Sequence, residues 1–158
     1  MSLLPLFQLF ENSALGTGIR ASTWLFAAIE SIHLLGLALI GGAVLVLDLR
    51  MAGYGLKELP VSRLAREARP WLMISLGLLI PTGVLLFLSE SVKCYYSPAF
   101  WVKMASLFLA LLFTFTVHWR VAIADESDTR PSWSRLVAAC SVILWFGVAW
   151  GGRWIGFQ

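Results

Sequence analysis

Charged residues are scarce in this chain. Asp, Glu, Lys and Arg make up only 13% of its 158 residues, whereas 59% are hydrophobic. A soluble domain needs about a quarter of its residues charged to cover its surface. The composition therefore excludes an ordinary soluble domain and predicts that lipid surrounds much of the chain. The net charge of +3 is small and scattered, so nucleic acid is not an expected partner.

Cysteine and the common catalytic motifs are also rare or missing. The two cysteines, Cys94 and Cys140, are predicted at different depths, so no internal disulfide is expected. There is no CxxC or CxxCH motif, which argues against covalent attachment of haem. GxSxG, P-loop, HExxH and GxGxxG motifs are missing too. The sequence therefore leaves open whether the protein is an enzyme.

Long apolar runs are what the chain has in place of charge. Four segments reach the length of about 20 apolar residues that crosses a bilayer, near residues 21–47, 71–88, 99–124 and 133–152. They predict an all-α integral membrane protein, with residues 1–158 forming one domain built as a four-transmembrane-helix bundle. Leu3, Leu6, Phe7 and Phe10 share one helical face, which predicts a short amphipathic helix on the membrane surface before the first span.

Lysine and arginine are distributed unevenly between the connections. The first and third connections carry most of them. Because basic loops stay in the cytoplasm, we expect a bacterial inner-membrane protein with both termini in the periplasm. We interpret Asp48 and Arg50, at the end of the first span, as a cytoplasmic cap and a topology signal.

Two ionisable residues lie inside the first predicted span. Glu30 and His33 are three residues apart, so they share a helical face. A charged side chain at mid-membrane costs about 2.5–3.5 kcal/mol on insertion scales, so such groups normally face the bundle interior and have partners. Gly36 is on the same face, one turn beyond His33, and would leave room beside the imidazole for a flat cofactor.

The third predicted span carries its own polar stripe. Lys103, Thr114 and His118 are separated by 11 and then 4 residues, which places them within about 60° of one another around a helix. This stripe is expected to point inward. His118 would lie about 10 Å closer to the cytoplasm than His33.

A b-type haem between the helices is our first hypothesis for these residues. Helical bundles commonly hold cofactors between facing helices, and histidine is the usual haem ligand. His33 is the first candidate for an iron ligand and His118 the second, in one site, in two, or with a single histidine on the iron. Glu30 would orient an imidazole or tune the site. Propionate partners would come from Arg50, Lys103 or Arg120. The protein would transfer electrons with a periplasmic redox protein or a membrane quinone.

Two other functions fit the same polar residues. Glu30, His33 and His118 could line a site or path for a metal ion such as copper, or for protons. Alternatively, the polar residues could only satisfy one another and set helix packing, as in an anchor or assembly subunit of a homo-oligomer or a larger membrane complex.

Parts of the sequence resemble a bacterial membrane family, domain of unknown function 6644. The resemblance rests on H-L-L-G, D-L-R and A-F-x-x-K within "IHLLGLALIGGAVLVLDLRMAGYG", "PWLMISLGLLIPTGVLLF" and "YYSPAFWVKMASLFLALLFTFTVHWR", and it covers roughly residues 24–125. The chain is also loosely similar to copper-resistance D-type membrane domains and to HemJ-type protoporphyrinogen oxidases, which are haem-binding four-helix proteins. The HemJ-type likeness implies that His33 and Lys103 match a functional histidine and lysine.

Overall fold

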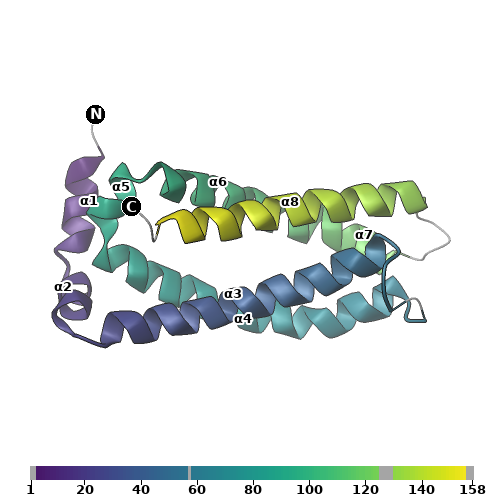
Figure 1. Ribbon diagram of the computed structural model, residues 1–158, viewed down its shortest axis with the longest axis horizontal. Coiled ribbons are helices and arrows are strands. Elements are labelled where there is room, and N and C mark those ends of the chain that lie inside the picture. Colours follow the sequence, from purple (N-terminus) through teal and green to yellow (C-terminus); the bar gives the residue numbers. More distant parts are fainter. Residues whose placement is uncertain (1–2, 57, 125–129, 156–158) are drawn as a thin grey trace.

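Four long helices form the body of the protein. The computed structural model describes residues 3–56, 58–124 and 130–155, and all regular structure in them is helical (Figure 1). Each of four stretches is long and apolar enough to cross a membrane. They are α3 (Leu25–Met51), α4 (Val61–Ser89), the run of α6 (Pro98–Phe113), η1 (Thr114–His118) and α7 (Trp119–Ile123), and α8 (Pro131–Ile155). The predicted four-helix membrane bundle is confirmed.

The first membrane-spanning helix begins later than its apolar run suggests, and the second begins earlier. Helix α3 begins at Leu25 rather than near residue 21, because residues 14–21 form a separate short helix that is capped by Ser22 in an extended conformation. Helix α4 begins at Val61 rather than near residue 71 and continues through Pro70. Its first turns are polar, so a search for apolar runs overlooks them although their backbone is helical.

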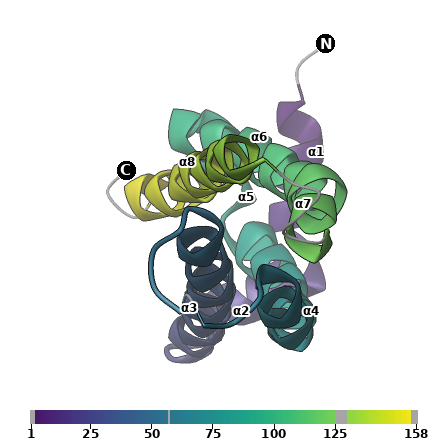
Figure 2. The same cartoon turned by 90° about the vertical axis from the view of Figure 1, so that its right-hand side faces the viewer.

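The bundle is built from two helical hairpins. Helix α3 packs mainly on α4, and α6 packs mainly on α8, while contacts of α3 with α8 and of α4 with α7 join the two pairs (Figure 2). Two apolar clusters fill the interior. One is centred on Ile40, Leu72, Ala110, Trp145 and Val148, and the other on Leu47, Met51, Ala65, Ala122, Val137 and Ala138.

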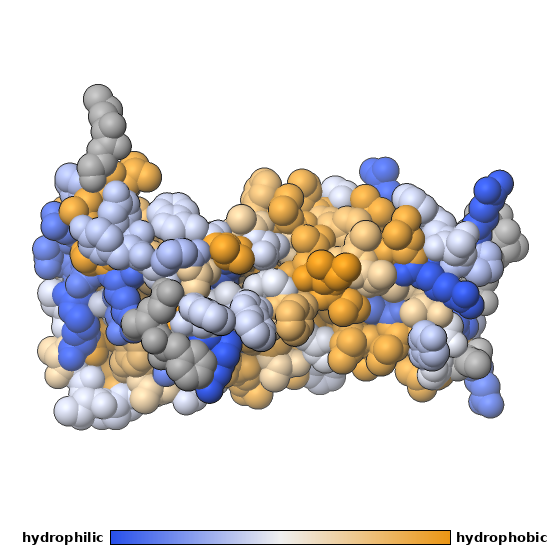
Figure 3. Space-filling view, turned by 45° about the horizontal axis from the view of Figure 1, so that its top comes forward, coloured by the Kyte–Doolittle hydropathy of each residue, from blue (hydrophilic) through white to orange (hydrophobic). Residues whose placement is uncertain are grey.

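The outer surface of the bundle is apolar in the middle and polar at both ends. Figure 3 shows hydrophobic residues gathered around the central part and hydrophilic residues at the two extremities. Each long stretch exposes large apolar side chains. More than half of the surface is exposed for Leu34, Ile74, Phe108 and Ile143. Such a surface suits lipid rather than water as its surrounding solvent.

Three short helices cover one end of the bundle, here called the capped end. They are α1 (Leu4–Glu11), α2 (Ala14–Ala21) and α5 (Ser91–Tyr96), and α1 and α2 run across the bundle axis (Figure 1). Helix α1 confirms the predicted N-terminal helix, whereas α2 and α5 were not predicted. Phe7 of α1 is buried, with its ring centroid 5.5 Å from that of Phe87 and 5.2 Å from that of Tyr95.

Two charged residues tie the short helices to the bundle. Glu11 Oε2 accepts a hydrogen bond of 2.6 Å from the backbone N–H of Val92, in the first turn of α5. Arg20 donates to the carbonyl oxygen of Ser89 at 2.7 Å and to that of Glu11 at 2.6 Å. Hydrogen bonds that involve an ionised partner are stronger than neutral ones. Helices α1 and α2 are thus fixed to the junction of α4 and α5.

Gly16 sets how closely α2 approaches α4. A Cβ atom on Gly16 would collide with the carbonyl oxygens of Leu88 and Glu11, whereas a Cβ on Gly18, in the same helix, would meet nothing within 4 Å. We expect Gly16→Ala to lower the free energy of unfolding by about 1–3 kcal/mol, the usual range for overpacking. Gly18→Ala is the matched control and should be neutral or stabilising. Equal stability of the two variants would show that α2 is not held closely against α4.

Cys94 is expected to make the stability of the protein fall at high pH. Cys94 and Cys140 are both free, and Cys94 is buried in α5. Burial, aided by the Glu90 carboxylate, raises the pKa of the Cys94 thiol from 9.0 to about 11. Because the folded-state pKa lies above the unfolded one, the protonated thiol contributes its full stability below pH 9.0 and loses it as the pH rises to about 11.

Between pH 9.0 and about 11, we expect the wild type to lose stability. The Cys94→Ala variant should not show this loss, because it has no thiol to ionise. Thermal unfolding of both proteins in the same detergent, from neutral pH to about 11, measures it. Parallel curves for the two proteins would contradict the assignment.

Candidate functional site

His33 is held by a hydrogen bond to the neighbouring helix. Its Nδ1 lies 2.9 Å from Oγ1 of Thr82, which is buried in α4. The Thr82 hydroxyl donates its one proton to the carbonyl oxygen of Leu78 at 2.5 Å. Since a hydroxyl has a single proton to donate, Thr82 must accept from Nδ1–H of His33. This fixes the imidazole tautomer and leaves the lone pair on Nε2.

Glycine lets the imidazole lie against the backbone of α4. A Cβ on Gly83 would come 3.3 Å from Cε1 of His33, so a larger residue there would press on the ring.

Gly36 has a different role from the one expected. A Cβ on Gly36 would lie 3.1 Å from Cγ of Leu79 and 3.4 Å from Cβ of Leu78, so the space beside Gly36 is used for packing α3 against α4.

Lys103 belongs to the opposite hairpin and lies within electrostatic range of His33. It is half-buried in α6 and packs along the glycines of α8. A Cβ on Gly151 would come 3.0 Å from Cβ of Lys103, and one on Gly152 would lie 3.7 Å from its Nζ. His33 and Lys103 thus lie on different hairpins in the half of the bundle next to the capped end.

Glu30 does not partner His33. Its side chain is exposed on α3, and the hydrogen bond that orients the imidazole comes from Thr82 instead. The i, i+3 spacing gives two residues neighbouring positions on a helix, but it does not decide which of them points inward.

His118 belongs to a second polar site, formed with Asp48. His118 Nε2 lies 2.6 Å from Oδ1 of Asp48, and each side chain is only 1% exposed. The bond joins α3 to η1, and Ser141 of α8 is buried beside the Asp48 carboxyl. The interpretation of Asp48 as a cytoplasmic cap is therefore wrong, because the carboxylate points into the bundle rather than toward solvent.

A π-helical turn sets the orientation of His118. Residues Thr114–His118 form η1, where the helix widens by one residue per turn between α6 and α7. Such turns are rare and are often found at functional sites. Thr114 and His118 are both buried, as the predicted inward stripe requires, and Thr114 accepts a hydrogen bond of 3.3 Å from Nε1 of Trp145.

The two polar sites lie at different depths. Asp48 follows His33 by 15 residues in one continuous helix, which corresponds to about 22 Å along its axis. His118 bonds to Asp48, while His33 bonds to Thr82 near the other end. The apolar cluster around Ile40 and Trp145 lies between them. The two histidines therefore cannot be axial ligands of one haem iron.

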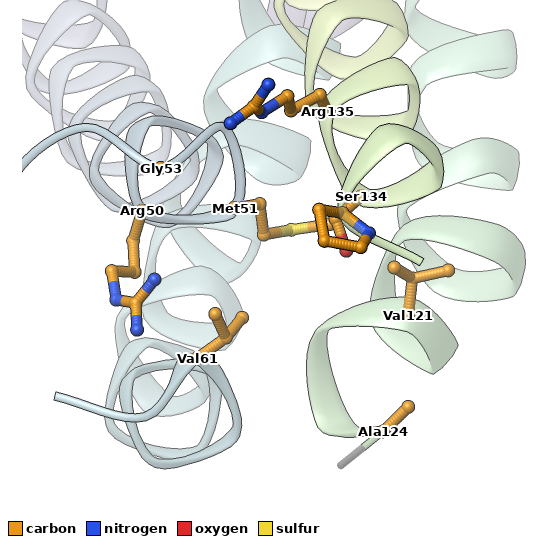
Figure 4. Close-up of a pocket in the computed structure, with 9 residues that line it drawn as sticks. Arg50, Met51, Gly53, Val61, Val121, Ala124, Ser134 and Arg135 are labelled. Carbon is orange, nitrogen blue, oxygen red and sulfur yellow. The ribbon is translucent and has the colours of Figure 1, made fainter. Parts of the chain in front are cut away.

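A pocket opens at the end opposite the capped end, here called the basic end. Figure 4 shows it between the end of α3, the start of α4, α7 and the start of α8. Its volume is about 200 Å³, and its lining includes Arg50, Met51, Ser134 and Arg135. The Nε–H group of Arg50 donates to the carbonyl oxygen of Leu59 at 2.8 Å, so this side chain belongs to the basic end rather than to the surroundings of His33.

A family model covers nearly the whole chain. It describes a family of unknown function, DUF6644, and matches residues 6–158. The chain belongs to the DUF6644 family. The match extends the resemblance expected from residues 24–125 to both ends of the bundle. No curated protein and no solved structure gives a significant match.

Two residues of these sites in the DUF6644 chain were missed or misinterpreted from sequence. Thr82 follows Pro81 in an apolar run, and a hydroxyl there is a weak signal because it can bond to its own helix. Asp48 lies near the end of a predicted span, and that position favours the solvent-facing interpretation. In the described residues, no group of three His, Cys, Asp or Glu side chains is placed to hold a metal ion.

Proposed function

We propose that this protein binds one b-type haem in the capped half of the bundle, with His33 as an axial ligand, and that it transfers electrons. The observation that carries the proposal is the Nδ1–H hydrogen bond from His33 to Thr82. Histidine ligands of metals almost always donate their second ring N–H to a fixed acceptor, which orients the ring and raises the basicity of the ligating nitrogen. His33 meets that requirement, with Nε2 left for iron.

The neighbours of His33 also suit a haem. Lys103 supplies a positive charge from the facing hairpin, so it is favoured as the propionate partner over Arg50, which lies at the basic end. Bound haem would supply a one-electron redox couple, whose potential depends on the axial ligand and on the charges around it. The chain's own contribution is to hold the imidazole through Thr82, to place a cation nearby, and to surround the site with apolar helices.

The remaining expectations follow from this proposal. Because the described part of the chain is almost entirely bundle, electrons would come from or go to a periplasmic redox protein or a membrane quinone. The positive-inside rule favours a bacterial inner membrane with the basic end in the cytoplasm and both termini in the periplasm. A metal-ion path is the weaker alternative, since no cluster of metal-ligating side chains was found among the described residues.

An optical spectrum of the detergent-purified protein tests the proposal. The protein is made in haem-replete cells and measured before and after reduction with dithionite. We expect a Soret band and an α band that sharpens on reduction, and extraction into acidified organic solvent should release the haem because it is not covalently attached. A folded, colourless protein that also fails to take up added haemin would reject the proposal.

A further inference from the structure

Three buried polar atoms near the Asp48–His118 pair have no hydrogen-bond partner in the part of the chain that the structure describes. They are Asp48 Oδ2, His118 Nδ1 and Ser141 Oγ. More than nine-tenths of buried polar groups in proteins are paired, and an unpaired one costs roughly 1–3 kcal/mol. Three such atoms in and beside one buried pair are unusual, and each of them could take part in a further hydrogen bond.

The hydrogen bonding indicates where a proton can be added. No partner for a proton on His118 Nδ1 is described, so the geometry favours a single imidazole proton, carried on Nε2 and directed at Asp48 Oδ1. The pair then carries one buried negative charge, and burying a charge without a counter-charge is costly. Asp48 Oδ2 has no hydrogen bond of ordinary geometry, but the Ser141 hydroxyl lies close enough to act on the carboxyl and can accept a hydrogen bond from it.

We propose that Asp48 is a proton-binding carboxyl, oriented by His118 and Ser141 and reached from the pocket at the basic end. Uptake of one proton forms an O–H bond at Oδ2 and changes the charge of the pair from −1 to zero. Oδ1 becomes the carbonyl oxygen, so it still accepts from His118 Nε2–H. Release reverses these steps, and no other reactant is consumed. This inference does not depend on haem binding at His33.

The pocket offers the route for the proton. Met51 lines the pocket and follows Asp48 by three residues in α3, so the two lie on the same helical face about one turn apart. Met51 is itself buried, whereas Ser134, which also lines the pocket, is partly exposed and Arg135 is exposed (Figure 4). Water in the pocket would therefore be separated from the carboxyl by about one helical turn.

Among the described residues at this end, the charged groups outside the pair are arginines and exposed glutamates. The elements around the pair carry chiefly arginines, which stay charged over the whole physiological pH range. Glu58 and Glu67 are exposed, and Glu67 pairs with Arg63 at 3.0 Å. The arginines of the surrounding α3, α4, α7 and α8 are Arg50, Arg63, Arg66, Arg69, Arg120 and Arg135.

Infrared difference spectroscopy of the full chain in lipid nanodiscs tests the proton site. Between about pH 5 and 8, where exposed carboxyls are ionised, we expect a carboxylic C=O band that Asp48→Asn removes and Glu67→Gln leaves in place. His118→Gln should move the midpoint of this band by at least one pH unit. If no band is removed by Asp48→Asn, the pair is only a structural link and the proposal fails.

An isotope label and a pocket-filling variant complete the infrared test. If Asp48→Asn does not fold, the wild type labelled with ¹³C-aspartate must show the isotope shift of the same band. For the route, Ser134→Trp, which fills the pocket, should slow deuterium exchange of the band at least tenfold. Ser132→Trp is the control, because Ser132 is exposed and does not line the pocket. Equal exchange rates in the two variants would overturn the proposed access from the basic end.

Discussion

Replacing His33 with alanine is expected to abolish haem retention, while replacing His118 leaves it intact. Under the proposed function His33 is the iron ligand, and Thr82 is the group that orients it. Thr82→Val removes the acceptor of the Nδ1–H bond, and loss of such a supporting bond usually lowers metal affinity about 10–100-fold. Haem content per protein after purification, and titration of the apoprotein with haemin, measure both effects.

The controls separate ligand loss from unfolding. Ser31→Ala changes an exposed polar residue two positions from His33 and should keep full haem content. His118→Gln tests the histidine about 22 Å away along the bundle. If His118→Gln lost the haem and His33→Ala kept it, the assignment of the ligand would be reversed. Addition of imidazole to His33→Ala, or to the smaller His33→Gly, should restore part of the spectrum if the cavity itself survives.

Removing one partner of the Asp48–His118 pair is expected to lower the free energy of unfolding more than any other single substitution in the half of the bundle next to the basic end. Both side chains are 1% exposed and are joined by a bond of 2.6 Å. Breaking a buried pair by removing one member typically costs about 3–5 kcal/mol, because the other is left buried without its partner. Replacing both with leucine should cost much less than the sum, since an apolar pair has no such penalty.

A double-mutant cycle measures this coupling. Asp48→Leu, His118→Leu and the double variant are unfolded in mixed micelles, and their free energies of unfolding are compared with that of the wild type. Leu49→Ala is the control, because Leu49 is exposed beside Asp48 and should change stability by no more than about 0.5 kcal/mol. Additive single effects would mean that the two side chains do not depend on each other.

The two polar sites give the bundle two chemically different halves. His33, Thr82 and Lys103 lie in the half near the capped end, and Asp48 and His118 lie in the half near the basic end. An apolar cluster that includes Ile40 and Trp145 separates them. If both proposals hold, the redox site at His33 and the proton site at Asp48 would allow electron transfer and proton uptake to use different faces of the membrane.

The sequence by itself determined the class of the fold. Four apolar runs in a chain with few charges leave a membrane-spanning helical bundle as the only way to satisfy both the side chains and the backbone. Local patterns also located the N-terminal helix and the inward direction of Thr114 and His118. The short helices α2 and α5 were not predicted, because they depend on contacts such as those of Gly16 and Glu11 with the end of α4.

Only the tertiary structure decided which polar residues meet. Spacing along one helix suggested that Glu30 partners His33, but the partner is Thr82, 49 residues away on α4. The same holds for Asp48 and His118, which are 70 residues apart and meet across the bundle, one on α3 and the other on a π-helical turn. Helical periodicity fixes which residues share a face, whereas the rotation and depth of one helix against another come from packing across the whole bundle, which no local pattern encodes.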